Sequence, residues 1–136
     1  MEIIVEDITG PLPPVVAANI LAHNKPDPDA FMATFADDAL LNDAQREFLG
    51  HDAIRAWAAE EIFGDHVTMD VLKAYRHYGD VVLHARVDGD FDKTNLPDPL
   101  ILSYYFSLRD NRITQLIILL NKSPWARLVA NSIGVS

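Results

Sequence analysis

The N-terminal half of the chain repeats its apolar positions at the spacing of a helix. Proline suits the first turn of a helix, so the first helix is expected to begin near Pro13 or Pro14. One face of this helix carries positions i, i+3, i+4 and i+7, which are Val16, Asn19, Ile20 and His23. Asp27 is a good N-cap for a second, short helix that starts at Pro28. The buried stripe of this second helix is expected to be Phe31, Met32 and Phe35.

A third helix is expected over residues 51–63, after a break at Gly50. Its buried stripe consists of Ile54, Trp57, Ala58 and Ile62. Gly64 suits the C-terminal cap, because glycine readily adopts the left-handed conformation that commonly ends a helix. A short strand over residues 39–43 precedes this helix, and Leu41 and Asp43 share one of its faces.

From residue 67 onward the chain alternates apolar and polar residues, which is the period of a strand. The expected elements are strands over residues 67–78, 81–88, 100–109 and 112–120, turns at Gly79-Asp80 and Asp110-Asn111, and a loop over 89–99. Helices that are segregated from antiparallel strands define the α+β class. We therefore expect a curved, mostly antiparallel sheet wrapped around three N-terminal helices, a cone-shaped α+β barrel whose open end has room for a small ligand.

The last expected strand is apolar on both faces between Leu116 and Leu120. One face covers the core, so the other face needs a second cover. The C-terminal segment around Trp125 is one candidate for that cover. The other candidate is a second subunit in a homodimer, in which Ile117 and Leu119 would pack against their mates.

Composition and charge narrow the class of protein further. The 136 residues are 49% hydrophobic and 23% charged, as expected for one globular domain over residues 1–136. The absence of cysteine excludes disulfides and cysteine-ligated zinc. Eleven basic and 20 acidic residues give a net charge of −9, which repels a phosphate backbone and an anionic membrane surface. We therefore expect neither nucleic acid nor a membrane as a partner.

The sequence also lacks the patterns of an inserted or exported chain. No apolar run reaches the roughly 20 residues that a membrane-spanning helix needs. Residues 1–9 carry acids where a signal peptide carries positive charge, so a cytoplasmic location is expected.

Three polar residues interrupt otherwise apolar faces. Asn19 lies on the stripe of the first helix, Asp43 shares a strand face with Leu41, and Tyr104 lies in the apolar row of residues 100–108. Burial of a polar group costs about 1–3 kcal/mol unless the group is hydrogen-bonded. Three such residues on converging elements therefore indicate a polar spot at the end of an apolar pocket.

Each of these residues also has a purely structural explanation. Tyr104 is equally consistent with a core tyrosine whose hydroxyl reaches water. Asn19 is able to satisfy a loop carbonyl, and Asp43 is able to cap the turn at the end of its strand. A carboxylate that gives up water beside Leu41 becomes a stronger base, unless Arg46, the one nearby cation, pairs with it across the loop.

The five histidines show no metal-binding spacing such as HxH or HExxH, so no metal site is expected. His23 is the best candidate for a catalytic histidine, because it extends the face of Asn19 by one turn. A partly exposed position near the helix end explains His23 as well. Motifs of serine hydrolases and of nucleotide or dinucleotide sites are absent, and no cofactor is expected.

Several stretches of the chain resemble the nuclear transport factor 2-like superfamily. They are residues 24–31 (NKPDPDAF), 35–39 (FADDA), Asn42-Asp43, 50–57 (GHDAIRAW) and 106–113 (FSLRDNRI). The resemblance covers about residues 12–121 and implies the cystatin-like cone fold. The superfamily includes ketosteroid isomerases, SnoaL-like polyketide cyclases, limonene epoxide hydrolases and scytalone dehydratases, and its fold hosts both enzymes and non-enzymes.

The resemblance to ketosteroid isomerase implies a role for each of the three polar residues. Asp43 matches the general base, four residues after the alanine of the FADDA motif. Asn19 and Tyr104 match the two oxyanion donors, which in that enzyme are a tyrosine and a protonated aspartic acid. The expected lining of the pocket is Val16, Trp57, Phe106 and Leu116.

The implied function is the binding of a small apolar molecule, with isomerase, cyclase or lyase chemistry that needs no cofactor. The alternative is a non-catalytic ligand-binding or dimerisation module that keeps the same cavity.

Overall fold

The described part of the chain, residues 6–121 of this computed structural model, is organised by a seven-stranded sheet. In order across the sheet, the strands are β1 (Glu6–Asp7), β4 (Thr68–His77), β5 (Asp80–Asp88), β6 (Ile101–Arg109), β7 (Arg112–Leu120), β2 (Phe35–Asp43) and β3 (Arg46–Leu49). Every neighbouring pair is antiparallel except β2 and β7, which run parallel.

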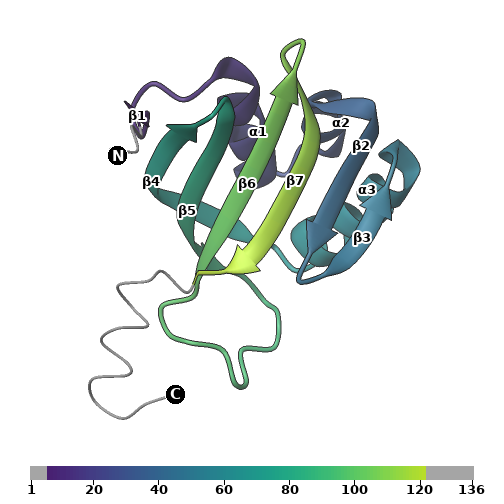
Figure 1. The fold of residues 1–136 in the computed structure, drawn as a ribbon. Helices are drawn as coiled ribbons and strands as arrows, with labels where there is room; N and C mark the ends of the chain where they lie inside the picture. The colour runs from purple at the N-terminus through teal and green to yellow at the C-terminus, as the bar shows by residue number, and fades with distance from the viewer. Residues whose placement is uncertain (1–5, 122–136) are drawn as a thin grey trace.

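Helices cover one face of this sheet, and Figure 1 shows them behind the strands. They are α1 (Pro14–Asn24), α2 (Pro28–Ala33), α3 (His51–Ala58) and a π-helical turn, η1 (Ala59–Phe63). The expected α+β class, with a curved, mostly antiparallel sheet and three N-terminal helices, is confirmed. In the part of the chain that the structure describes, no helix is long and apolar enough to cross a membrane.

The core lies between the helices and the inner face of the sheet. Strand register aligns one row of apolar side chains across four neighbouring strands, and the row consists of Val81, Phe106, Leu116 and Leu41. All four side chains are buried. Burial of one such side chain stabilises the fold by about 1.5–3 kcal/mol. This row therefore joins four neighbouring strands through one part of the core.

Two strands were not expected from the sequence. β3 pairs with β2 through a two-residue turn, Ala44-Gln45, in which both residues have positive φ angles of 52° and 69°. Asparagine and glycine are the usual residues of such a turn. Alanine and glutamine are not, so the sequence of this turn does not indicate a hairpin. β1 consists of two residues that pair with Arg76 and Tyr75 of β4, too short a segment to show a period.

The boundary between α2 and β2 also differs from the prediction. Phe35, expected on the second helix, is the first residue of β2. Thr34 is the C-cap of the helix, and its hydroxyl and backbone N–H both donate to the carbonyl oxygen of Phe31 (2.6 Å and 3.2 Å). The carbonyl of Thr34 then accepts from the backbone N–H of Ile113 on β7 (2.8 Å), which starts the new strand. Phe35 is still buried in the core, as the apolar stripe predicted.

Two glycines have roles other than the expected ones. Gly64 follows the third helix, but its φ angle of −63° is that of an ordinary helix. A Cβ atom there would lie 2.6 Å from the carbonyl oxygen of Glu60, so only glycine allows the π-helical turn to close this tightly. Gly79 forms its turn with Tyr78 rather than with Asp80, and both turn residues have positive φ angles. The predicted turn is therefore wrong by one residue.

The outer face of the sheet is partly apolar, as expected for the last strand. Ile117 of β7 lies opposite Tyr105 of β6, and Leu119 lies opposite Ser103. Tyr105 and Leu119 are both 38% exposed, so this face has no complete cover among the described residues. The other expected cover, the segment around Trp125, lies outside the described residues.

The Ala44-Gln45 turn predicts a stabilising substitution. Left-handed backbone costs a residue with a Cβ atom roughly 1 kcal/mol, and glycine avoids this cost. We expect Gln45→Gly to raise the free energy of unfolding by about 0.5–1 kcal/mol in urea denaturation. The gain is smaller than the full strain, because glycine also gives the unfolded chain more freedom.

Gly79→Ala is the matched control in the second hairpin. Gly79 has a φ angle of 87°, and a Cβ atom added there would meet no other atom within 4 Å, so the substitution adds backbone strain without a clash. It should lower the free energy of unfolding by about 1 kcal/mol. If Gln45→Gly lowered the free energy of unfolding as much as Gly79→Ala does, the positive φ angle of Gln45 would be contradicted.

Candidate functional site

A cavity of about 380 Å³ lies at the end of the cone where β2 and β7 end. β4 and β6 begin at this same end (Figure 1), and residues of the β5–β6 loop line the cavity. Most of the wall is apolar, and its apolar residues include Phe31, Trp57, Ile62, Val67, Met69, Val87, Phe91, Leu96, Leu100, Leu102, Leu116 and Ile118. Six polar residues complete the lining: Asn19, His23, Asp43, Glu61, Asp65 and Tyr104.

Strand register brings two of the expected site residues into one row. Asp43 of β2 lies level with Ile118 of β7, and Ile118 lies level with Tyr104 of β6. Neighbouring strands are about 4.8 Å apart, so Asp43 and Tyr104 are separated by about 10 Å, with Ile118 between them. All three residues line the cavity. A small molecule that lies over Ile118 therefore has a carboxylate on one side and a phenol on the other.

The expected pocket lining is only partly found. Trp57 and Leu116 line the cavity, but Val16 and Phe106 do not. Both of these residues are buried in the hydrophobic core. Phe106 lies one row deeper in the sheet than Tyr104, beside Leu116, and this depth cannot be read from the alternation of a single strand.

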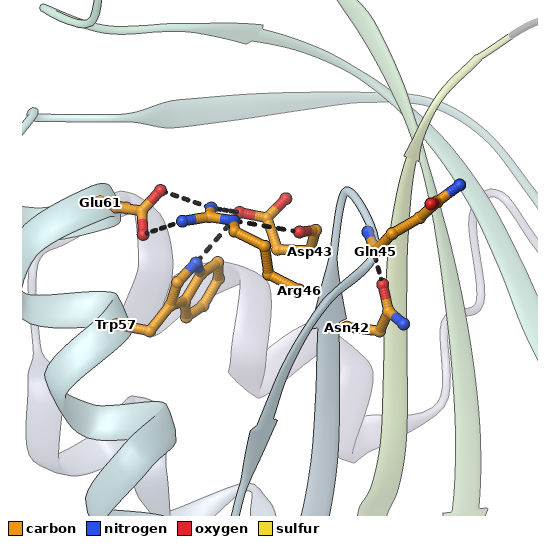
Figure 2. Close-up of polar contacts among 6 residues, drawn as sticks. All are labelled: Asn42, Asp43, Gln45, Arg46, Trp57 and Glu61. Atoms are coloured by element: carbon orange, nitrogen blue, oxygen red, sulfur yellow. Dashed lines mark hydrogen bonds and ion pairs between the residues drawn. The ribbon is translucent and has the colours of Figure 1, made fainter.

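Asp43 ends β2 and holds its carboxylate between two donors. Its Oδ2 atom accepts hydrogen bonds from Trp57 Nε1 (3.0 Å) and from Arg46 Nη2 (2.8 Å). Figure 2 shows the three side chains converging from the hairpin and from α3. The sequence left open whether Arg46 pairs with this carboxylate, and the structure contains that ion pair. Oδ1 makes no hydrogen bond to another described residue, so this oxygen is available for a contact with a ligand.

Arg46 is itself held from the other side by Glu61. Its Nη1 and Nη2 atoms contact the two carboxylate oxygens of Glu61 at 3.0 Å and 2.7 Å, a bidentate pair (Figure 2). The hydrogen bonds to Glu61, and then the charge of Asp43, raise the pKa of the Arg46 guanidinium above its usual range. Because the Arg46 side chain is 51% exposed, each pair stabilises the fold by about 1 kcal/mol at most. The network therefore fixes orientations more than it adds stability.

The hairpin that carries Arg46 is fixed by two further contacts. The backbone N–H of Gln45 donates to Asn42 Oδ1 (2.9 Å), which Figure 2 also shows. The backbone N–H of Ala44 donates to the carbonyl oxygen of Ile118 (3.2 Å). The turn is thereby attached to β7 directly beside the cavity, and Asp43 and Arg46 lie opposite each other across it.

Tyr104 places a neutral phenol against the cavity. Its side chain is buried, and its hydroxyl forms no hydrogen bond with another described residue. Burial, with a smaller contribution from the charge of Asp43, raises the pKa of the Tyr104 hydroxyl well above its usual range. The hydroxyl therefore keeps its proton at every physiological pH and is available as a hydrogen-bond donor.

Asn19 and His23 enter the cavity from α1, one turn apart. Asn19 Nδ2 donates to Thr34 Oγ1 (3.0 Å), and both residues are buried. His23 Nδ1 lies 3.3 Å from Asn24 Oδ1. Burial lowers the pKa of His23 to about 4, so the imidazole is neutral at physiological pH. His23 is 5% exposed, which excludes the partly exposed position considered from the sequence.

Sequence reasoning missed the acidic residues at the rim of the cavity. Glu61 lies four residues after Trp57, and this spacing places two residues on one face of a helix. Because Trp57 was expected to line the pocket, this spacing could have indicated Glu61 as well. Asp65 had no such signal, because it lies in the turn after η1.

In residues 6–121, no group of three or more histidine, aspartate or glutamate side chains is placed to hold a metal ion.

Comparisons with known proteins identify the relatives of this fold. Residues 16–116 match the family model described as a SnoaL-like domain. The chain is similar to the crystal structure of a proposed polyketide cyclase from Sinorhizobium meliloti, at 28% identity and a TM-score of 0.73. That match covers 82% of this chain and 98% of the other. A comparison with curated proteins found no match.

A second solved structure supports the fold alone. It is a hypothetical protein from Catenulispora acidiphila with a ketosteroid isomerase-like fold, in complex with trimethylamine. The identity is 24% and the TM-score 0.67, and the match covers 91% of this chain and 95% of the other.

The burial of His23 predicts how stability depends on pH. Between pH 6.5 and about 4, the unfolded chain takes up a proton at residue 23 and the folded chain does not. Lowering the pH across this window therefore favours unfolding, and stability rises with pH. The difference in pKa corresponds to about 3 kcal/mol.

We expect the wild type to lose about 3 kcal/mol more stability than His23→Gln between these two pH values. Urea denaturation at a series of pH values measures this difference directly. Other titrating groups are common to both proteins and cancel in the comparison. Parallel stability curves for the two proteins would contradict a buried, neutral His23.

Proposed function

The chain belongs to the SnoaL-like domain family, and on that premise we propose that its cavity binds a small, largely apolar molecule and moves a proton next to a carbonyl group of that molecule. The observation that carries the proposal is the row of Asp43, Ile118 and Tyr104 across three neighbouring strands. This row supplies a base and a neutral donor on two sides of one apolar floor. Side chains alone supply the groups that this chemistry needs.

Asp43 is the proposed general base. Its Oδ2 atom is held by Trp57 and Arg46, which leaves Oδ1 free to take a proton from the carbon next to the carbonyl. An oriented carboxylate lowers the cost of reaching the reactive geometry. The ion pair with Arg46 holds the carboxylate in this orientation before the ligand binds.

Tyr104 is the proposed donor to the oxygen that becomes negative when the proton leaves. Its hydroxyl has its proton and no partner among the described residues, so it is free to donate to the ligand. Donors placed where charge develops contribute most when water is excluded. We assign this contact to Tyr104 rather than to Asn19, because Tyr104 lies in the same row of the sheet as Asp43.

The second candidate function is ligand binding without turnover. The observation that favours it is the engagement of Asp43 by both Trp57 and Arg46, because these contacts also explain a structural carboxylate. The two candidates share the cavity and differ only in whether Asp43 Oδ1 exchanges protons with a ligand.

We also propose that the chain forms a homodimer through the outer face of its sheet. Tyr105, Ile117 and Leu119 form a continuous apolar strip on adjacent strands β6 and β7. An isologous two-fold contact would bury this strip against its own copy. The strip faces away from the cavity, so dimerisation leaves the site accessible.

Exchange of α-protons in heavy water tests the proposed chemistry. We expect the wild type to accelerate deuterium uptake next to the carbonyl of 2-tetralone, an apolar ketone, as followed by NMR. Asp43→Asn removes the base and should lower this rate by about 100-fold or more. The free energy of unfolding should change by only about 1 kcal/mol, since the lost ion pair is partly exposed.

Asp38→Asn is the matched control, because Asp38 is an exposed carboxylate on the same strand outside the cavity. It should leave the exchange rate unchanged. Binding of 2-tetralone by the wild type without accelerated exchange would favour the non-catalytic function. Full exchange activity in Asp43→Asn would remove Asp43 from the mechanism.

Light scattering tests the proposed dimer. At micromolar concentration the wild type should have twice the chain mass of 15.2 kDa. Ile117→Lys places a charge in the apolar strip and should shift the protein to a single chain. Leu21→Lys is the control, because Leu21 is an exposed apolar residue on α1. A wild type that has the mass of one chain would contradict the dimer.

A further inference from the structure

His23 is a buried, titratable residue in the cavity wall that the proposed proton transfer does not use. It lies in the last turn of α1, and its imidazole is almost completely removed from solvent. In a neutral histidine one ring nitrogen is a donor and the other is an acceptor, so the role of His23 depends on its tautomer. The neighbouring contacts determine that tautomer.

Asn24 fixes the tautomer of His23. The Nδ2 atom of Asn24 donates to the carbonyl oxygen of Met69 (2.9 Å), and its Oδ1 accepts from the backbone N–H of Met69 (2.9 Å). These two backbone bonds allow only one orientation of the amide. The atom that faces His23 Nδ1 at 3.3 Å is therefore an oxygen, which only accepts. Nδ1 must carry the proton, so Nε2 of the neutral ring has a free lone pair.

The lone pair of His23 Nε2 is open to the cavity. In the described part of the chain, every fully buried side-chain nitrogen or oxygen has a hydrogen-bond partner. No described residue bonds to Nε2, so this atom is not fully buried. His23 lines the cavity and is only 5% exposed, and we infer that the exposed part of Nε2 faces the cavity.

Asn19 presents a second acceptor to the same space. The hydroxyl of Thr34 gives its one hydrogen to the carbonyl oxygen of Phe31, so its contact with Asn19 must be donated by Asn19 Nδ2. The amide oxygen of Asn19 has no partner among the described residues and is open to the cavity by the same reasoning. Asn19 and His23 are four residues apart, which is about 6 Å along one face of a helix.

We propose that His23 Nε2 and Asn19 Oδ1 form an acceptor pair, in which His23 Nε2 accepts the hydrogen of a hydroxyl group of the ligand. The proposal rests on the proposed function and names its substrate class: an apolar ring that carries a hydroxyl group in addition to the reacting carbonyl. A hydroxyl supplies one hydrogen and so satisfies His23 Nε2, whereas a methyl ether or a bare ring leaves this nitrogen unpaired in an apolar wall. The low pKa of His23 keeps this acceptor neutral throughout the physiological range.

Binding of 2-naphthol and of its methyl ether, 2-methoxynaphthalene, tests the acceptor pair by calorimetry. The two probes share an apolar ring and differ in one hydrogen-bond donor. We expect the wild type to bind 2-naphthol about tenfold more tightly than the ether. His23→Phe should reduce this preference to about twofold or less, mainly through weaker binding of 2-naphthol. His77→Phe, a histidine outside the cavity lining, should keep the preference.

The outcomes separate the acceptor pair from the cavity itself. Equal binding of both probes by the wild type would overturn the hydroxyl inference and leave the cavity proposal intact. Failure of both probes to bind would overturn the cavity proposal and this inference with it. The ¹⁵N spectrum of the wild type gives a check that does not depend on how His23→Phe folds. It should show the Nδ1–H tautomer of His23, and an Nε2–H tautomer would contradict the acceptor.

Discussion

The parallel pairing of β2 with β7 is the contact on which the site depends. It joins the N-terminal helices and their strand to the C-terminal hairpin, and it sets Asp43 level with Ile118 and Tyr104. A slip of one residue would turn Asp43 to the outer face of the sheet. Leu41, on the same face of β2, lies in the deeper apolar row with Leu116, so the core itself holds the register.

The cavity has two zones of different electrostatic character. At the rim, the charged groups are the network of Arg46 with Asp43 and Glu61, and the nearby Asp65. Toward α1 the polar groups are neutral, since the His23 imidazole is uncharged and Asn19 is an amide. Burial explains this division, because a charge is tolerated near water and is costly deeper in an apolar wall. A ligand with one reactive and one hydroxylated end would match both zones.

The sequence predicted the parts of this arrangement that depend on local pattern. Periodicity identified the three helices and the four long strands, and a break in periodicity marked Asn19, Asp43 and Tyr104, which all line the cavity. The β3 hairpin was missed because Ala44 and Gln45 adopt a conformation that their side chains do not favour.

Other features were unpredictable because they depend on contacts between distant segments. The depth of Phe106 follows from strand register, and the tautomer of His23 follows from the bonds of Asn24 to the backbone of Met69. The residue types at these positions suggested a polar pocket. They did not indicate which atoms donate and which accept, since that depends on the folded neighbours.

Methyl NMR on isotope-labelled isoleucine tests the central claim, that a small apolar molecule lies over the row between Asp43 and Tyr104. Ile118 forms the floor of the cavity, and Ile117, the preceding residue on β7, faces the outer side of the sheet. During titration with 2-tetralone, we expect a saturable shift of the Ile118 methyl signal and an unchanged Ile117 signal. A shift of Ile117 alone, or no shift of Ile118 at saturating ligand, would contradict the claim.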